Sequence, residues 1–297
     1  MDDATLAGLR TAASAVFDVG FATMVGALAT LALLQDTSSD WAARGARRGR
    51  TLFTRASVLA LAASLAWMAV QAVALSDMAP IEALLSVGGL IVDTGFGRAW
   101  AVATLALAAC VAVAMATRYR PVPLRALGVA VTVVAVAHAS AGHAGANGFD
   151  WLVPTMAVHL LATGLWAGCV LAAVLAVLHG ETHAVDGVRY AGRLSALATA
   201  ALAGVVATGL ASAWHGLGGS LAALAPATAP AWGQVLDVKL ALVATAVVLG
   251  GVNRFVVMRS LPKSWPHFVR VLRIEAVVLL AVLVAAAWLA NGEPPAV

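Results

Sequence analysis

"GVAVTVVAVAHASAGHAG", residues 128–145, is an apolar run without Asp, Glu, Lys or Arg, and its second half carries His138 and His143. An apolar block of about 20 residues is long enough to cross a hydrocarbon core of about 30 Å as a helix. Imidazole is costly in hydrocarbon, so two of them at one end of such a block indicate a membrane helix that ends at a polar site.

The whole chain repeats this pattern. Hydrophobic residues make up 62% of the 297 residues and charged residues only 11%, with a mean hydropathy of +0.94. A soluble domain of this length needs more charge to cover its surface. The sequence therefore predicts an all-α polytopic membrane protein, a single integral membrane domain over residues 1–297. Its eight transmembrane helices are predicted near residues 12–34, 53–75, 97–117, 123–142, 152–178, 191–215, 232–256 and 268–290.

The basic residues predict the orientation. Fifteen of the 18 Lys and Arg residues lie in alternate connections or at the span ends that border them. They are Arg44, Arg47, Arg48, Arg50, Arg55, Arg118, Arg120, Arg125, Arg189, Arg193, Arg254, Arg259, Lys263, Arg270 and Arg273. Because basic connections stay in the cytoplasm, both termini are predicted to face outward. The pI of 9.7 then reports topology and gives no support for a nucleic-acid partner.

Two further features concern the ends and halves of the chain. The start, "MDDATLAGLR", is acidic and lacks a basic region, so no removable signal peptide is expected. "FGRAWAVATLALA" (96–108) and "WGQVLDVKLALVA" (232–244) each open a span after an aromatic residue and a glycine. This similarity predicts that spans 1–4 and 5–8 are two parallel four-helix repeats.

Four of the seven histidines fall at the predicted outer side. His138, His143, His159 and His215 lie at the outer ends of spans 4, 5 and 6. His138 and His159 are each about 7 to 11 Å inside their span ends at 1.5 Å per residue, so we expect them to face each other. His143 has an alternative interpretation as a solvated loop residue, and His215 as an ordinary interfacial residue.

Span 5 carries a stripe of unusual residues. In "WLVPTMAVHLLATGLWAG" (151–168), Met156, His159, Thr163 and Trp166 follow at steps of 3, 4 and 3, which places them on one helix face. We expect Thr163 to orient the His159 ring. Thioether and imidazole ligands together favour copper, Cu(I) especially, although ligand type does not exclude zinc. The sequence thus predicts a metal site of His138, His143, His159, His215 and Met156, with Thr163 and Trp166 in support.

Charged residues inside the spans are expected to face the bundle, because a charge in lipid is expensive. Asp18, Asp237 and Glu275 are candidates for a supporting or coupling role if they line a cavity. Arg254 and Glu275 are predicted to form an ion pair that locks spans 7 and 8 together.

Several pieces of the chain occur in a specific order and spacing. They are "TGFGRAWAV" (94–102), "GHA" (142–144), "HLLATGLWAG" (159–168), "WGQVLDVKLALVA" (232–244), "GGVNRF" (250–255) and "RIEAVVLLAVLVAAAWLANGEPP" (273–295). Together they resemble the copper resistance protein D family, known as CopD or PcoD, over most of residues 94–295. Span 1 and the first connection carry no part of the resemblance.

The resemblance implies an eight-span protein of the bacterial inner (plasma) membrane with periplasmic termini. It also implies copper as the bound ion, a periplasmic CopC-like copper-binding protein as partner, and inward uptake. By motif it points to His143 and His159, whereas His138 and His215 come from the topology alone. The chain lacks an MxxM or MxxxM pair and a GxxxxGK[ST] motif, so neither a methionine ladder nor an ATP-driven pump is expected. We expect no enzymatic activity.

Two other functions fit the residues. A membrane oxidoreductase would use His159 with His138 or His215 as the axial ligands of a haem b. A structural or assembly subunit would need none of these histidines.

Overall fold

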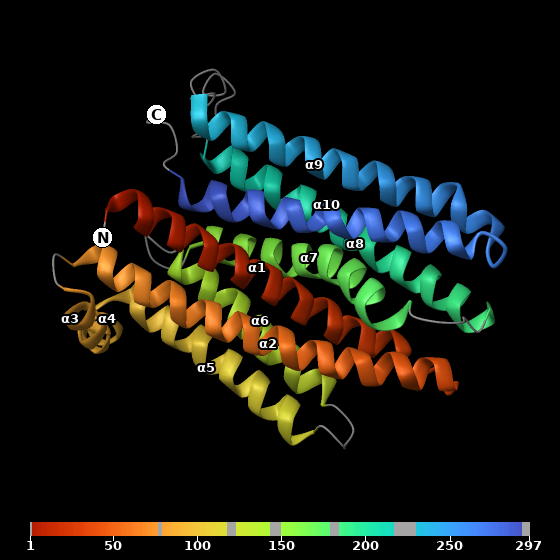
Figure 1. Cartoon of the computed structure of the whole chain (residues 1–297), viewed down its shortest axis with the longest axis horizontal. Helices are drawn as coiled ribbons and strands as arrows, with labels where there is room; N and C mark the ends of the chain where they lie inside the picture. The colour runs from red at the N-terminus through yellow and green to blue at the C-terminus, as the bar shows by residue number, and fades with distance from the viewer. Residues whose placement is uncertain are drawn as a thin grey trace.

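The computed structural model describes residues 2–76, 79–117, 123–142, 150–178, 184–216 and 230–292. Within these ranges 91% of the residues are helical and none lies in a β-strand. Eight of the helices are long and apolar enough to cross a membrane. The predicted all-α polytopic membrane fold is therefore confirmed (Figure 1).

The spanning helices lie close to the predicted residues. In chain order the helices are α1 (Asp3–Leu34), α2 (Asp40–Leu75), α3 (Pro80–Leu85), α4 (Val87–Asp93), α5 (Gly95–Ala116), α6 (Leu124–Ala141), α7 (Leu152–Ala172), α8 (Ala184–Gly216), α9 (Pro230–Phe255) and α10 (Trp265–Asn291). A π-helical turn, Ala173–Val177, extends α7, and a 3-10 turn, Val257–Ser260, follows α9. The short helices α3 and α4 were not predicted.

Two helices begin well before their predicted spans. The side chain of Asp2 caps α1 by accepting a hydrogen bond from the backbone N–H of Thr5, and Ser39 caps α2 through the N–H of Ala42. These caps start the helices in polar sequence, where hydropathy gives no signal. The arginines from Arg44 to Arg55, predicted to lie in a connection, are consequently on α2.

Helix α1 lies at the centre of the packing. It packs against α2 and α7, and α5 and α6 close these three into a group of five helices. On the other side α8 packs against α7, while α9 pairs with α10, which rests on α1. Figure 1 shows α2 and α5 along one side of the molecule and α9 along the other. The predicted relation of spans 1–4 to spans 5–8 as repeats stays a prediction.

The contact between α1 and α7 depends on glycine. A Cβ on Gly26 would overlap the backbone of Gly168, and a Cβ on Gly168 would overlap the carbonyl of Ala22. Small residues let two membrane helices approach to backbone contact, where dispersion and weak polar contacts are strongest. We call this contact the glycine seam.

The start of α1 and the end of α10 lie at one end of the bundle, which we call the termini end (Figure 1). There Arg10 Nη2 donates to the carbonyl oxygen of Asn291 at 3.2 Å, and Asn291 Nδ2 donates to Ser14 Oγ at 3.0 Å. These bonds join the start of α1 to the end of α10, as an even number of crossings requires.

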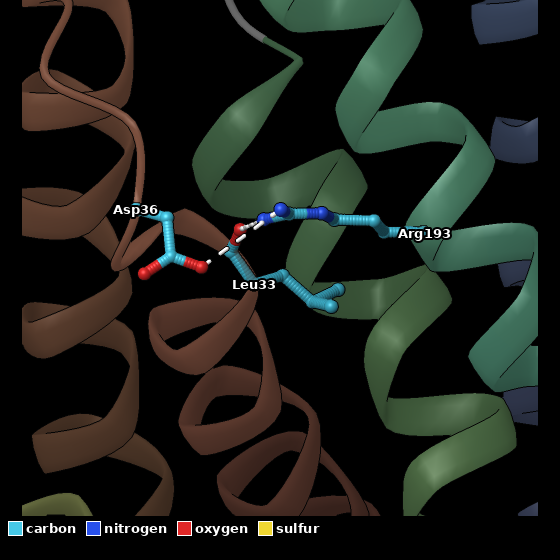
Figure 2. A network of polar contacts seen from close by, with 3 residues as sticks. All are labelled: Leu33, Asp36 and Arg193. Atoms are coloured by element: carbon cyan, nitrogen blue, oxygen red, sulfur yellow. Dashed lines mark hydrogen bonds and ion pairs between the residues drawn. The ribbon is translucent and has the colours of Figure 1, made fainter.

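The opposite end is fastened by Arg193 of α8 (Figure 2). Its Nη1 donates to the carbonyl oxygen of Leu33 at 3.1 Å, which satisfies one of the free carbonyls in the last turn of α1. Its Nη2 lies 3.8 Å from Oδ2 of Asp36. In the part of the chain that the structure describes, this is the one ion pair within 4.0 Å.

Candidate functional site

The ring of His159, on α7, is held by α8. Its Nδ1 lies 2.8 Å from Oγ1 of Thr208. The single proton of that hydroxyl is already donated, because Oγ1 is 2.6 Å from the carbonyl oxygen of Gly204. His159 must therefore donate the proton on Nδ1 to Thr208, which leaves Nε2 with a free lone pair. An imidazole in this tautomer is a metal ligand whose orientation is fixed through its second nitrogen.

The ring of His159 lies beside Gly209 of α8. Thr208 lies in "GVVATG", residues 204–209, and a Cβ on Gly209 would come within 3.7 Å of Cε1 of His159. The imidazole thus lies against the helix backbone. The Thr208 hydroxyl bonds back to the carbonyl one turn earlier, as helical Thr commonly does, and this bond fixes which partner donates to which.

Polar groups continue from His159 toward the termini end. His215, on the last turn of α8, is exposed, and its ring meets Trp151 edge to face at a centroid distance of 5.2 Å. Between His215 and Thr208 along α8, Ser212 has a buried hydroxyl with no hydrogen-bond partner among the described residues. Met156 is partly buried against the core formed by α1, α2, α5, α6 and α7.

Toward the opposite end the same face of α7 carries Thr163 and Trp166. The hydroxyl of Thr163 is buried without a partner among the described residues, so the prediction that Thr163 orients His159 is wrong. The ring is held across the helix interface by Thr208, because the imidazole turns toward α8 and away from its own helix. Trp166 is buried and borders a cavity of about 190 Å³ between α7, α8, α9 and α10.

Two charged side chains accompany His159. Lys239, on α9, acts electrostatically on both His159 and the Asp18 carboxylate of α1. All three side chains are partly buried. The charge of Lys239 therefore reaches both the imidazole of α7 and a carboxyl of α1, a relation that the sequence did not suggest. Asp237, by contrast, is exposed and borders neither of the two cavities described here.

His138 has different neighbours. Its ring stacks on Phe17 of α1 with centroids 4.3 Å apart and planes 15° apart. It borders a separate cavity of about 650 Å³ at the termini end, together with Trp67, Trp100 and Arg10. The expected approach of His138 to His159 is thus not observed, because α6 turns its histidine toward α1 while α7 turns its own toward α8.

The structure does not gather the predicted ligands into one cluster. In the described ranges no three His, Cys, Asp or Glu side chains come close enough together to hold a metal ion. His143 lies outside the described residues, as do His179 and His183. The assignment of His138, His143, His159, His215 and Met156 to one metal site stays a prediction.

The predicted ion pair between Arg254 and Glu275 is wrong. Arg254 Nη1 donates to Ser195 Oγ at 2.8 Å and to Thr199 Oγ1 at 3.2 Å, both on α8. Glu275 is 3% exposed and lines the 190 Å³ cavity. The guanidinium is thus directed toward α8, where two hydroxyls one helical turn apart accept from the same nitrogen.

Sequence comparison assigns the chain as a whole. The family model for the copper resistance protein D-like N-terminal domain matches residues 1–149, half of the chain, and the model for copper resistance protein D matches residues 188–289. The protein belongs to the copper resistance protein D family. No curated protein and no solved structure matches the chain significantly.

Membership in the copper resistance protein D family confirms the resemblance carried by the motifs. It makes the chain a copper-resistance membrane protein. The two matched regions also locate the described features. Asp18 and His138 lie in the N-terminal match, and Thr208, Lys239 and Glu275 lie in the second. His159 falls between the two matches, on the helix that contacts both parts of the molecule.

Proposed function

We propose that this copper resistance protein D family member takes up or relays copper at the bacterial inner membrane, through His159 in the half of the bundle nearer the termini. The observation that carries the proposal is the His159–Thr208 pair, since it fixes the ring of a membrane-embedded imidazole and leaves Nε2 unprotonated. Copper is the substrate, and the borderline imidazole donor suits Cu(I) and Cu(II) alike.

The path of the ion follows the interface of α7 and α8. His215 beside Trp151 forms its mouth, and Ser212 and Thr163 supply unpartnered hydroxyls on either side of His159. Met156, one turn from His159, and His143, in the adjoining connection, complete the ligand set we propose. His138 belongs to the neighbouring cavity and serves as a second ligand position at the same end.

The direction follows from charge. Because 15 of the 18 basic residues lie in the connections at the opposite end or in the helix turns next to them, that end is cytoplasmic and the termini end is periplasmic. A periplasmic copper-binding protein of the CopC kind then delivers copper at the termini end, where His215 is exposed. The protein acts as a carrier and not as an enzyme.

The haem alternative has less support. One iron needs two imidazole nitrogens about 4 Å apart. The ring of His138 stacks on Phe17 of α1, whereas that of His159 is bonded to Thr208 of α8, and His215 lies seven residues from Thr208 along α8, about 10 Å at 1.5 Å per residue.

The test is the copper content and the visible spectrum of detergent-purified protein after incubation with Cu(I) and, separately, with Zn(II). Wild type is compared with His159→Ala, with the double variant His138→Ala/His159→Ala, and with His267→Ala. His267 is the control because it lies at the opposite end, in the first turn of α10.

Near-stoichiometric copper that is lost in His159→Ala and kept in His267→Ala is the expected result. A Soret band in the wild type that disappears in the double variant would show that these histidines bind haem and not copper. Equal copper in all four proteins, or none in the wild type, would reject the proposed site.

A further inference from the structure

The cavity of about 190 Å³ between α7, α8, α9 and α10 holds a carboxyl group that has no use in the copper path described above. Glu275, on α10, is 3% exposed and lines the cavity, and no cationic group lies within 4.0 Å of it among the described residues. A buried carboxylate without a counter-ion is strongly unfavourable in a membrane interior, so the group must hold a proton or bind a cation.

The opposite wall of the cavity is shaped around this carboxyl. Gly250, on α9, faces Glu275 so closely that a Cβ there would come 3.2 Å from Oε1. The next residue, Gly251, has open space at the same position. One glycine of the pair in "GGVNRF" therefore makes room for the carboxyl, whereas the other does not.

A second oxygen acceptor lies one turn along α9. Asn253 is 4% exposed and donates through Nδ2 to the carbonyl oxygen of Phe268 at 3.4 Å. Its Oδ1 consequently points away from that bond, and this atom is buried with no hydrogen-bond partner among the described residues. The cavity is thus lined by two acceptors, the Glu275 carboxyl and the Asn253 amide oxygen, and no hydrogen bond from the described residues reaches either.

The charged and titratable groups around Glu275 are few. From α9 the cavity receives Arg254, whose guanidinium is engaged by Ser195 and Thr199 of α8. From α7 it receives Trp166 and Val170, and from α10 itself Phe268 and Leu272, none of which titrates near neutral pH. Among the lining residues only Arg254 and Glu275 are ionisable, and Arg254 stays protonated, so Glu275 is the group that can gain or lose a proton in this cavity.

We propose that this cavity is a binding site for a hard monovalent cation, H⁺ or Na⁺, held by Glu275 and Asn253. Carboxylate and amide oxygens are hard donors, which suit these ions and not Cu(I). The site lies on the side of Trp166 away from His159, so the two sites are chemically and spatially separate. An exchange of this cation for copper rests on the proposed function, whereas binding of the cation is tested without copper.

The experiment is labelling of the detergent-purified full chain with a hydrophobic carbodiimide, which reacts with protonated carboxyl groups in apolar surroundings. The site of labelling is located by peptide mass spectrometry across a pH series, in Na⁺ or in choline. Glu82 of α3, an exposed carboxylate, is the internal control. In parallel the melting temperature of wild type and Glu275→Gln is measured in the same buffers.

We expect labelling of Glu275 several-fold above Glu82, declining as the pH rises. Protection by Na⁺, with a Na⁺-dependent rise in Tm of about 5 °C that Glu275→Gln lacks, identifies Na⁺ as the ion. Labelling that depends on pH but not on Na⁺ identifies H⁺. Absence of Glu275 labelling at every pH, with the same Tm response in both proteins, overturns the proposal. If Glu275 is labelled in a protein that binds no copper, the cation site is supported and only the proposed copper path is rejected.

Discussion

Helix α7 is packed in two different ways on its two sides. Against α1 it forms the glycine seam, where Gly26 and Gly168 bring the backbones into contact. Against α8 it presents His159, Thr163 and Trp166, and the interface carries a hydrogen bond, unpartnered hydroxyls and the edge of a cavity. The difference shows that this bundle places its rigid contact and its polar path on opposite faces of one helix.

The glycine seam cannot accommodate a larger side chain, because the two backbones are already in contact there. The interface of α7 with α8, in contrast, borders a cavity. In a close-packed region, added volume causes strain. In a cavity lined by unpaired oxygens, the oxygens remain desolvated until an ion or a proton binds. Substitutions of similar size should therefore have very different consequences on the two sides.

The largest effect is expected at the glycine seam. Gly26→Ala adds a Cβ that overlaps the backbone of Gly168, so α1 and α7 must separate, and the melting temperature should fall by about 10 °C. Gly8→Ala is the matched control, since a Cβ at that exposed position of α1 meets nothing within 4 Å. Thermal unfolding in detergent measures both. Equal melting temperatures would show that the helices do not touch here.

The second effect is expected on the polar side, in copper affinity and not in stability. Thr208→Val keeps the shape of the side chain but removes the acceptor for His159 Nδ1, and copper affinity should fall by about 10- to 100-fold. Thr245→Val, which removes an exposed hydroxyl on α9, is the control. Copper titration of the purified variants measures the affinity. An unchanged copper affinity in Thr208→Val would show that Thr208 does not support the copper site.

A smaller effect is expected within the cavity. Gly250→Ala places a Cβ 3.2 Å from Glu275 Oε1, which forces the carboxyl to shift by a few tenths of an ångström. Carbodiimide labelling of Glu275 should fall about three-fold, the equivalent of less than about 1 kcal/mol. Gly251→Ala has open space and should label like the wild type. Identical labelling of both variants would argue that α9 does not shape the site.

The smallest effect is expected at the opposite end. Arg193→Met removes the contact with Asp36, but that carboxylate is 80% exposed and 3.8 Å away, so the ion pair contributes less than about 1 kcal/mol (Figure 2). The melting temperature should fall by about 2 °C, mainly through the lost bond to the Leu33 carbonyl. Arg259→Met, an exposed arginine in the turn after α9, is the control. A fall as large as that of Gly26→Ala would contradict the ranking.

The spans were predictable because hydropathy is a local property that every residue of a segment shares. The partners of the polar residues were not, because they depend on how far each helix is rotated about its axis. Residue counting placed His138 and His159 at similar depth, but α6 turns one toward Phe17 and α7 turns the other toward Thr208. Hydropathy carries no information about this rotation.

The most informative missed residue is Thr208. Its one signal in the sequence is the neighbouring Gly209, whose Cβ position lies 3.7 Å from Cε1 of His159, whereas Gly204 faces Ala162. Glu275 was identified as a candidate from its position within a span, yet its predicted partner Arg254 was wrong. The guanidinium of Arg254 donates to Ser195 and Thr199 of α8 instead, a choice set by the rotation of α9, which the sequence does not reveal.

The glycine seam also sets an order on biosynthesis. Its two sides, Gly26 and Gly168, are separated in the chain by three complete spans, α2, α5 and α6. When α1 enters the bilayer its partner has not yet been translated, so the small-residue face of α1 must first be covered by lipid or by the insertion machinery. The centre of the bundle is completed only when α7 inserts, so the helices made before it lie in the membrane without one of their main packing partners.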